Sequence, residues 1–508
     1  MTVTLSVKNG GSGVPPLLLS VEDRAKLLDA GNKSQDHYKK KLSPFRYKLR
    51  AAILPLIRSE IPALTRIQFS LRHPLLDLYF AWTANLASHT FYVLLLPLPI
   101  WYGGAELTRD LVFILGFGIY ITGTLKDFLC LPRPRSPPLH RITMSGYTTK
   151  EYGFPSSHSA NATGVSLLLF VHFYAQIGQV STPTSVASFT LLFIYYASLI
   201  FGRVYCGMHG FFDIITGSFI GCTIFLARYC VKQTWDHVVV YSGSWFFPPA
   251  LIAFYLGLIH LHADPVDDCP CFDDSVAFIG VLLGYELSYW AFVKYDYSRV
   301  LLPYVYDTAS LRGAAPVSIP FSLEKLGLFR SAARSVVGVV LVVVWKAVSK
   351  PLLFTVLPPV YKKLGVYLPR SGFTSTALTK DSTKKIRRSS IHINEGVSEM
   401  TDFVRSLGDN TVVDSVGVEN DIDFYENIDA MQKSRQRRSD SVGKDVPSIS
   451  VIDIYDESNT DFDDLPVICG ALKPRYDVEV IARLIVYAGV SSVAIWGFAV
   501  VVQYTPFM

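Results

Sequence analysis

The sequence is short of charged residues and of cysteine. Only 18% of its 508 residues are Asp, Glu, Lys or Arg, whereas soluble domains average about 25%. The formal net charge of +5 is small for this length and gives no support to nucleic-acid binding. The seven cysteines are scattered, several of them in apolar runs, which is not the spacing of a disulfide framework. Residues 1–45 are polar and lack an apolar segment with a cleavage site, so we expect no cleaved signal peptide.

Apolar residues are abundant instead. Half of the chain is hydrophobic and 13% is aromatic, which predicts a polytopic membrane protein diluted by soluble segments. A membrane span needs about 20 mainly apolar residues, and in hydrocarbon such runs must be helices rather than open strands. We therefore predict the all-α class, a polytopic membrane helical bundle. The expected spans lie near 88–104, 108–126, 164–180, 185–203, 209–229, 239–262, 275–293 and 482–503, with a less regular apolar run at 335–361.

The chain divides into segments of different composition. The mixture of basic and apolar residues at 38–72 predicts an amphipathic helix in the membrane interface or a soluble helix packed on the bundle, and both remain open. The expected boundaries are 1–73 for a polar N-terminal region with this basic segment, 74–300 for a transmembrane core, 301–370 for further membrane segments with a possible hairpin, 371–475 for a Ser-rich loop, and 476–508 for a C-terminal transmembrane helix.

The Ser-rich loop has little apolar periodicity, which is typical of disorder. Two stretches in it, KKIRRSSIH and RQRRSDSVG, resemble sites of basophilic kinases, although such short motifs often match by chance. Kinases are therefore candidate partners at Ser389, Ser390, Ser439 and Ser441. If these sites are real, the loop faces the cytosol.

Lysine and arginine residues near the span ends predict the topology. The loop 294–334 is rich in them, so we expect it in the cytosol. The loops 127–163 and 204–208, and the acidic loop DPVDDCPCFDD, then face the lumen. Basic residues on both sides of 335–361 predict a hairpin or re-entrant element. One conflict remains, because the basic N-terminal block favours the cytosol while two spans before residue 127 place it in the lumen.

Three polar clusters stand at the ends of predicted spans. The first, KDFLCLPRPRSPP, holds Lys126 and Arg133; the second, EYGFPSSHSANATG, holds Ser156, Ser157 and His158; the third, FGRVYCGMHGFFD, holds Arg203, His209 and Asp213. A charge at bilayer depth costs roughly 2.5–3.5 kcal/mol on insertion scales and by default faces a bundle interior or a watery cavity. Three cations on one membrane face, without a matching number of carboxylates, predict an oxyanion site, because Arg offers phosphate a planar fork and Lys a point charge.

The second and third clusters add a helix terminus and two imidazoles. Pro155 suits a first helical turn, so the N–H groups that follow form an anion site, to which the two serine hydroxyls can add donors. His209 and Asp213 are four residues apart and share a helix face. The carboxylate can therefore fix the tautomer and leave the other nitrogen as nucleophile or base, while His158 is available as an acid. This set describes a two-step phosphoryl transfer.

Each cluster also has a purely structural explanation. Lys126 and Arg133 can be anchors that flank a span, Ser-Ser-His can be a helix N-cap, and the His–Asp pair can be a satisfied buried pair or part of a proton relay. The occurrence of all three clusters in order, on one predicted face, favours the phosphate site. Gly207 and Gly210 beside the third-cluster histidine let the turn there approach closely.

The order K-x6-R-P, P-S-x-H and R-x5-H-x3-D resembles the signature of the type 2 phosphatidate phosphatase (PAP2) and vanadium haloperoxidase superfamily. The resemblance implies an acid-phosphatase-type catalytic core without metal or cofactor. It assigns phosphate binding to Lys126, Arg133, Ser156, Ser157 and Arg203, and catalysis to His209 as nucleophile, Asp213 as its orienting partner and His158 as general acid. This sequence departs from the family at Ser157, usually Gly, and at Gly202, usually Ser, and neither change removes a charge or an imidazole.

The residues around the motifs narrow the resemblance. LPRPRSPP, EYGFPSSHSANA and RVYCGMHGFFD resemble the sphingosine-1-phosphate phosphatase branch, including its fungal type, over residues from about 75 to 300. That branch acts on sphingoid long-chain base phosphates at the endoplasmic reticulum, with a lumenal active site, so the resemblance implies a lipid substrate within the bilayer. Alternatives are a broader lipid phosphate or polyprenyl pyrophosphate phosphatase, or a silent lipid-binding or transport protein. The oligomeric state stays open.

Residues outside the signature receive plainer interpretations. Cys269 and Cys271 in DDCPCFDD can bind metal or oxidise in the lumen, but an exposed loop is the simpler interpretation. Cys206 is expected to serve packing. His140 and Arg141, between the first two clusters, are expected to be solvated, with substrate contact as the alternative.

Overall fold

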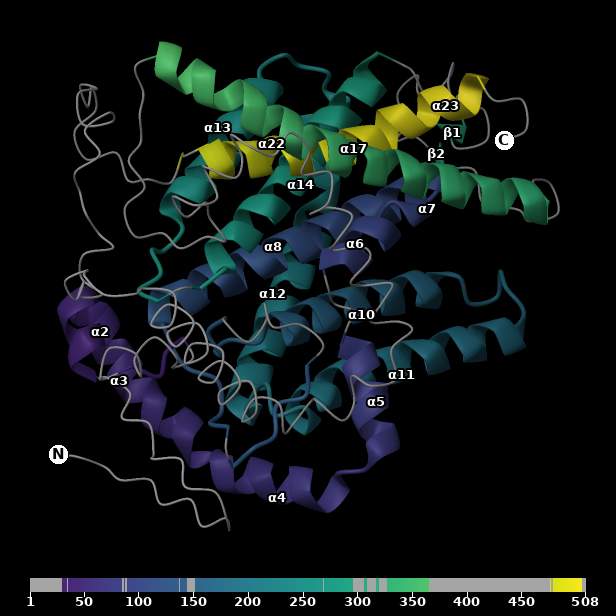
Figure 1. The fold of residues 1–508 in the computed structure, drawn as a ribbon. Coiled ribbons are helices and arrows are strands. Elements are labelled where there is room, and N and C mark those ends of the chain that lie inside the picture. Colours follow the sequence, from purple (N-terminus) through teal and green to yellow (C-terminus); the bar gives the residue numbers. More distant parts are fainter. Residues whose placement is uncertain are drawn as a thin grey trace, which may run out of the picture.

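The computed structural model describes residues 30–33, 35–84, 86, 89–136, 138–143, 151–267, 269–295, 306–307, 317–318, 327–364, 476 and 478–504. Its helices are joined by loops and by one antiparallel pair of two-residue strands, β1 (Tyr306–Asp307) and β2 (Val317–Ser318). The predicted all-α class is confirmed (Figure 1). The Ser-rich loop and its four candidate kinase sites lie outside the described residues.

Six of the described helical segments are long and apolar enough to cross a membrane. They are α8 (Ala105–Leu129), α11 (Thr182–Tyr205), α12 (Phe211–Trp235) with the π-helix η2 (Asp236–Tyr241), α14 (Cys271–Lys294), α17 (Leu328–Lys363), and α22 (Val478–Ser492) continued by η6 (Val493–Gly497) and α23 (Phe498–Tyr504). Shorter helices fill the remaining predicted spans: α6 (His89–Leu95), α7 (Leu98–Trp101), α10 (Ser157–Ala175) and α13 (Phe247–Leu261). The chain is thus a multi-pass membrane protein.

The hairpin expected within 335–361 is wrong, because these residues belong to the single helix α17. Three prolines lie inside this helix, and a membrane helix tolerates proline because its neighbours can satisfy the freed backbone groups. The first turn of α17 accepts a hydrogen bond at the Ser331 carbonyl from Tyr102, beside the start of α8, at 2.5 Å. Near its other end, Tyr361 donates to the Tyr476 carbonyl at 2.8 Å. The helix therefore runs the length of the bundle (Figure 1).

Four N-terminal helices pack around one end of the bundle: α2 (Gln35–Lys41), α3 (Pro44–Ser59), α4 (Ile61–Leu71) and α5 (Pro74–Ala84). The helices α3 and α4 bury Arg50 and Gln68, whereas Phe45 and Phe69 are 69% and 89% exposed. Ile57 and Leu64 of the same helices are buried as well, so the face that meets the bundle is mixed, and some apolar side chains face outward. The helices therefore pack on the bundle, and contact of their exposed apolar side chains with a membrane interface stays a prediction.

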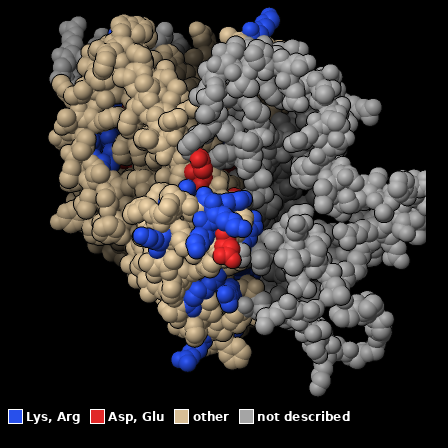
Figure 2. Space-filling view, turned by 90° about the vertical axis from the view of Figure 1, so that its left-hand side faces the viewer, with Lys and Arg blue, Asp and Glu red and all other residues tan. Residues whose placement is uncertain are grey.

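The same end of the molecule is basic on its surface. Lys39, Lys40, Lys41 and Lys48 of α2 and α3 are exposed. Figure 2 shows Lys and Arg side chains gathered over this face. The basic N-terminal block lies at the same end of the bundle as Lys126, which stands near the end of α8. Its position relative to the site therefore agrees with the count of two spans between them.

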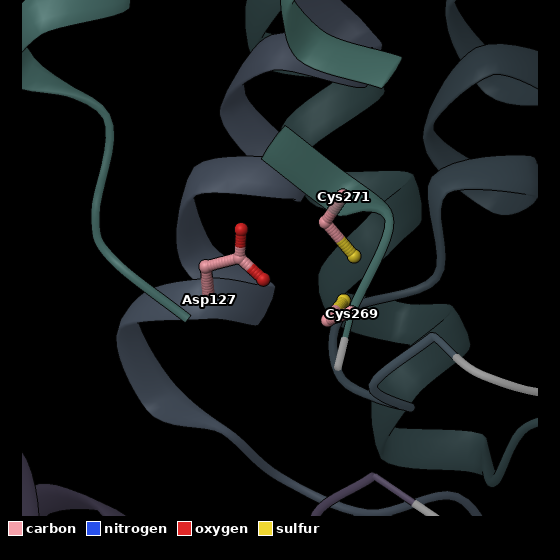
Figure 3. A group of neighbouring side chains, drawn as sticks. All are labelled: Asp127, Cys269 and Cys271. Carbon is pink, nitrogen blue, oxygen red and sulfur yellow. The ribbon is translucent and has the colours of Figure 1, made fainter. Parts of the chain in front are cut away.

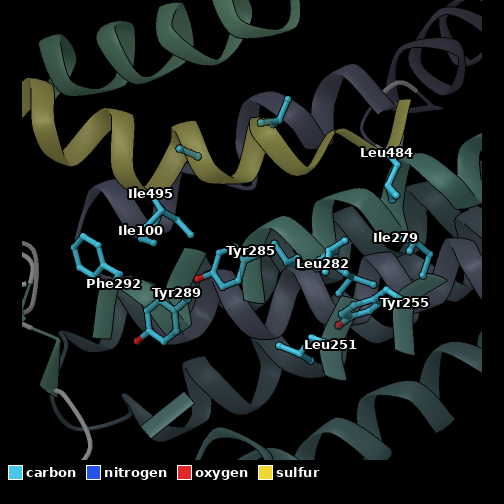
Figure 4. Close-up of a cluster of buried hydrophobic side chains, with 14 of the residues drawn as sticks. Ile100, Leu251, Tyr255, Ile279, Leu282, Tyr285, Tyr289, Phe292, Leu484 and Ile495 are labelled. Atoms are coloured by element: carbon cyan, nitrogen blue, oxygen red, sulfur yellow. The ribbon is translucent and has the colours of Figure 1, made fainter. Parts of the chain in front are cut away.

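The largest hydrophobic core joins α8, α13 and α14 to the C-terminal helices α22 and α23 (Figure 4). Two glycines of α14 allow close contact, because a Cβ on Gly284 would lie 2.2 Å from the Ala488 carbonyl oxygen. Trp101 donates its indole N–H to the Ala494 carbonyl at 3.0 Å. The C-terminal helices are therefore part of the same core that supports α8.

Candidate active site

Five helix ends meet at the end of the bundle that α3 and α4 cover. The helices α8 and α11 end there, and α10, α12 and α14 begin there, so the three sequence clusters come together (Figure 1). The first and third clusters touch where Arg133 Nη1 lies 3.2 Å from His209 Nε2. The second and third touch where the Ser156 N–H donates to the Asp213 carbonyl at 3.1 Å. The tertiary structure thus assembles one site from segments up to 87 residues apart in sequence, from 126 to 213.

The three predicted cations are all buried in this site. Lys126 and Arg133 are each 2% exposed and Arg203 is 5% exposed. The Nε of Arg203 has no hydrogen-bond partner among the described residues. Burying several like charges together is unfavourable unless anions neutralise them. The burial of three cations is therefore compatible with the anion site that the sequence predicts, and that role stays a prediction.

Sequence reasoning missed Glu151, which supplies one anion to this cluster. Its Oε2 lies 2.5 Å from Lys126 Nζ and 3.6 Å from Arg133 Nη2. Arg133 Nε also donates to the Glu151 carbonyl at 3.1 Å. Glu151 stands four residues before Pro155 in the second cluster, but nothing in the sequence pairs its carboxylate with Lys126 and Arg133.

The serines of the second cluster have local hydrogen bonds at the start of α10. Ser156 is the N-cap, and its Oγ accepts from the Ser159 N–H at 3.3 Å. Ser157 Oγ accepts from Thr122 Oγ1 of α8 at 2.9 Å. The capping interpretation of Ser156 is therefore correct as a description of its contacts, and capping also places the start of α10 beside the cations.

His209 is buried in the short turn between α11 and α12. Since Arg is always a donor, the Arg133 contact makes Nε2 an acceptor and assigns the ring proton to Nδ1. Nδ1 lies 3.5 Å from Asp213 Oδ2, which itself accepts from the Gly210 N–H at 2.9 Å. Burial, followed by the charges of Arg133 and Lys126, lowers the pKa of His209 well below its usual value. The imidazole is thus neutral, with its Nε2 lone pair directed at the cation cluster.

The turn that carries His209 needs glycine. Gly207 has a φ of +63°, and a Cβ there would lie 2.6 Å from the His140 carbonyl oxygen. At Gly210 a Cβ would lie 2.1 Å from Glu60 Oε2. The predicted close approach at both glycines is confirmed.

The N-terminal helices hold this turn in place, which the sequence did not reveal. Glu60 Oε1, between α3 and α4, accepts from the Phe212 N–H at 2.9 Å. Gln68 Nε2 donates to the carbonyls of His140 and Tyr205 at 2.7 and 2.8 Å. Burial raises the pKa of Glu60 above its usual value. These contacts join residues 72 to 152 positions apart, and no sequence signal links them.

The solvated interpretation of Arg141 is wrong. Arg141 is 3% exposed and its Nη2 donates to the Pro134 carbonyl at 2.9 Å. The neighbouring His140 is only partly buried, and its N–H donates to Gln68 Oε1 at 2.8 Å. Both residues fix the loop that follows Arg133.

The exposed-loop interpretation of Cys269 and Cys271 is also wrong, since both are buried beside Asp127 (Figure 3). The ligand atoms of these three side chains lie within 4.8 Å of one another. Among the described residues, this group has the spacing to hold a metal ion. Burial raises the pKa of the Cys269 thiol well above its usual value. Cys206 is buried among Phe80 and Tyr205 and serves packing, as expected.

A cation cluster at the end of a membrane helical bundle, with a neutral buried histidine facing it, defines a membrane-embedded phosphatase. A family model described as the PAP2 superfamily matches residues 107–236, a range that contains all three clusters. Among curated proteins, the chain is 40% identical to a dihydrosphingosine 1-phosphate phosphatase of Saccharomyces cerevisiae over 332 residues, 65% of this chain and 77% of the relative. It is 35% identical to a dihydrosphingosine 1-phosphate phosphatase of Schizosaccharomyces pombe, over 63% of this chain and 73% of the relative.

A more distant match is a probable sphingosine-1-phosphate phosphatase of Dictyostelium discoideum, 27% identical over 60% of this chain and 74% of the relative. No solved structure matches. The chain belongs to the dihydrosphingosine 1-phosphate phosphatase family within the PAP2 superfamily. It is an enzyme, a membrane lipid phosphatase that hydrolyses phosphate monoesters.

Proposed function

We propose that this enzyme hydrolyses sphingoid long-chain base 1-phosphates to the free base and phosphate through a phosphohistidine at His209. The observation that supports it most strongly is the neutral His209, whose Nε2 lies 3.2 Å from Arg133 Nη1. Arg133 can hold a phosphate oxygen while Nε2 approaches the phosphorus. Products of this kind feed sphingolipid and ceramide metabolism.

In the first step the Nε2 lone pair attacks phosphorus in line, and the bond to the lipid oxygen breaks. The leaving alkoxide takes its proton from His158, which lies close enough to His209 for its charge to act on that ring. Asp213 accepts a hydrogen bond from the Nδ1–H, and its carboxylate stabilises the positive charge that the ring gains. Lys126, Arg133 and Arg203, with Ser156, Ser157 and the start of α10, hold the phosphoryl oxygens.

In the second step water attacks phosphorus and the P–N bond breaks. His158, now neutral, takes a proton from the water, and phosphate leaves. Both steps balance without an added reductant, oxidant or metal.

The alkyl chain has a suitable place beside the site. A largely apolar cavity lies among α6, α8, α10 and α11, lined by residues that include Tyr92, Leu111, Leu115, Leu169, Phe173 and Tyr195. Tyr195 in its wall lies on α11, the helix that carries Arg203 about two turns closer to the site end. A cavity between helices that opens toward lipid suits a single long chain.

A substrate panel on the purified protein tests the proposal. We expect kcat/KM for dihydrosphingosine, phytosphingosine and sphingosine 1-phosphates to exceed kcat/KM for phosphatidate and for polyprenyl pyrophosphate. A preference for phosphatidate would overturn the substrate assignment and leave the phosphohistidine chemistry intact.

We further propose that the enzyme resides in the endoplasmic reticulum membrane with its site on the lumenal side, as the family resemblance implies. The basic residues do not decide the side, because they occur on the site end in α2 and α3 and on the other end at Lys294 and Arg330. Phosphorylation at Ser389, Ser390, Ser439 or Ser441 by cytosolic kinases is the competing proposal. The described residues that flank the segment 365–475 lie at the site end, since Tyr361 contacts Tyr476 there.

A further inference from the structure

Glu151 places a carboxylate inside a site that must bind an anion. Its side chain is 12% exposed, and its Oε2 contacts Lys126 Nζ at 2.5 Å and lies 3.6 Å from Arg133 Nη2. Both cations are among those that hold the phosphate under the proposed function. The arriving phosphate therefore has to share or replace this carboxylate.

The backbone around Glu151 is fixed, so the carboxylate cannot move far from the site. Arg133 Nε donates to its carbonyl, and two residues later the Gly153 N–H donates to the Leu131 carbonyl at 2.8 Å. Tyr152, between them, is fully buried and its hydroxyl accepts from the Asp267 N–H at 2.8 Å. Rotation of the side chain leaves the carboxylate at the edge of the bound phosphate.

For a plain phosphate ester this carboxylate is a disadvantage, because like charges repel at close range in a buried site. For a substrate that carries a cation next to its phosphate, the attraction between the carboxylate and that cation offsets the repulsion between the carboxylate and the phosphate. A sphingoid base 1-phosphate has a primary ammonium on the carbon adjacent to the phosphate-bearing carbon. The intervening bonds hold that nitrogen about 3 to 5 Å from the phosphate oxygens.

We propose that Glu151 binds the ammonium of the sphingoid base and so distinguishes amino-lipid phosphates from lipid phosphates without an amine. This inference rests on the proposed function and deepens it by naming the head-group contact. In the empty enzyme the carboxylate neutralises Lys126 and Arg133, and on substrate binding it exchanges these partners for the ammonium. The ion pair forms only with a substrate that brings both charges.

The test compares two substrates of equal chain length in wild type and in Glu151→Gln: a sphingoid base 1-phosphate and the corresponding alkyl phosphate without the amine. In wild type we expect kcat/KM for the amine substrate to be at least about tenfold higher, since a charged hydrogen bond is worth roughly that much or more. In Glu151→Gln, kcat/KM for the amine substrate should fall about tenfold or more, and kcat/KM for the amine-free substrate should stay the same or rise. The ratio of the two should therefore collapse.

Glu60→Gln is the matched control, because Glu60 is a second carboxylate near the turn of His209 but contacts the Phe212 backbone rather than the cations. It should change both substrates by the same factor. Inhibition by inorganic phosphate gives a second readout that requires a folded site, and Glu151→Gln should bind phosphate more tightly than wild type.

Three results would overturn the inference. An equal loss for both substrates in Glu151→Gln would make Glu151 a residue that only positions Lys126 and Arg133. An equal gain would make it only a competitor of phosphate. If the ratio of the two kcat/KM values is the same in Glu151→Gln as in wild type, Glu151 does not recognise the amine. Wild-type turnover of the sphingoid substrate, measured in the same assay with phosphatidate as the comparison, tests the proposed function separately. That function fails if this turnover is absent or if phosphatidate is preferred, whatever the effect of Glu151→Gln.

Discussion

At the scale of single residues, the burial of His209 suits the nucleophile role that we propose for it. The ring is 1% exposed and three cations surround it, so its charged form is disfavoured before substrate arrives. The contact from Arg133 and the nearby Asp213 assign the proton to Nδ1. The reactive lone pair is thereby available at neutral pH without a separate base.

We predict that His209→Ala abolishes turnover and removes phosphoenzyme labelling while the protein still accumulates in the membrane. Radiolabelled substrate followed by rapid quenching measures both. His158→Ala is the matched comparison: it should retain labelling with an ester whose leaving group needs no proton, because only the acid is lost. Detectable phosphohistidine in His209→Ala would contradict the assignment.

The same burial predicts a pH dependence of stability. The folded state keeps His209 neutral because its pKa is lowered, whereas the unfolded chain takes up a proton below about pH 6.5. The unfolded state then binds more protons, so stability falls as pH falls, by up to about 1.4 kcal/mol for each pH unit below 6.5. Thermal unfolding in detergent at pH 7.5 and pH 5 should show a smaller drop for His209→Asn than for wild type; equal drops would refute this.

At the scale of elements, the short turn between α11 and α12 is held from outside by α3 and α4. Glu60 caps the start of α12 through the Phe212 N–H, and Gln68 holds the loop at His140 and the end of α11 at Tyr205. The N-terminal helices therefore support the turn and the loop that carry the predicted site residues.

Gly207→Ala tests how tightly that turn is packed. The substitution meets both a φ of +63° and a carbonyl oxygen at 2.6 Å, so we expect a loss of about 2 kcal/mol or more in stability and at least a tenfold lower kcat/KM. Gly178→Ala is the control, because its φ is +85° with nothing within 4 Å of the new Cβ. It should cost about 1 kcal/mol and leave kcat/KM unchanged; equal effects of the two variants would show that packing at Gly207 is unimportant.

At the scale of the whole molecule, the single crossing of α17 determines which segments share a side. The N-terminal helices, the predicted site residues, the end of α17 and Tyr476 all lie at the site end. The loop 176–181 between α10 and α11 lies at the opposite end.

We predict that glycan acceptor sites inserted before α2 and after residue 364 share the same glycosylation state, and that a site inserted within 176–181 has the opposite state. With a lumenal active site the first two are glycosylated and the third is not. Gel shifts with and without glycosidase measure this. Glycosylation within 176–181 alone would place the site in the cytosol and make the four serines accessible to kinases. Opposite behaviour of the first two would contradict the single crossing of α17.

The sequence by itself determined the helical class and the positions of the spans, and it predicted the eight site residues that the fold brings to one end of the bundle, because apolar length and motif spacing are local properties of the chain. The prediction of a hairpin at 335–361 was wrong, because basic residues on both flanks do not indicate whether the helix between them turns back. Only the tertiary structure decided which partners meet: Glu151 among the cations, Glu60 and Gln68 against the histidine turn, and Asp127 beside buried Cys269 and Cys271. These contacts join segments far apart in sequence, so they depend on how the helices pack, and packing leaves no periodic trace in a single chain.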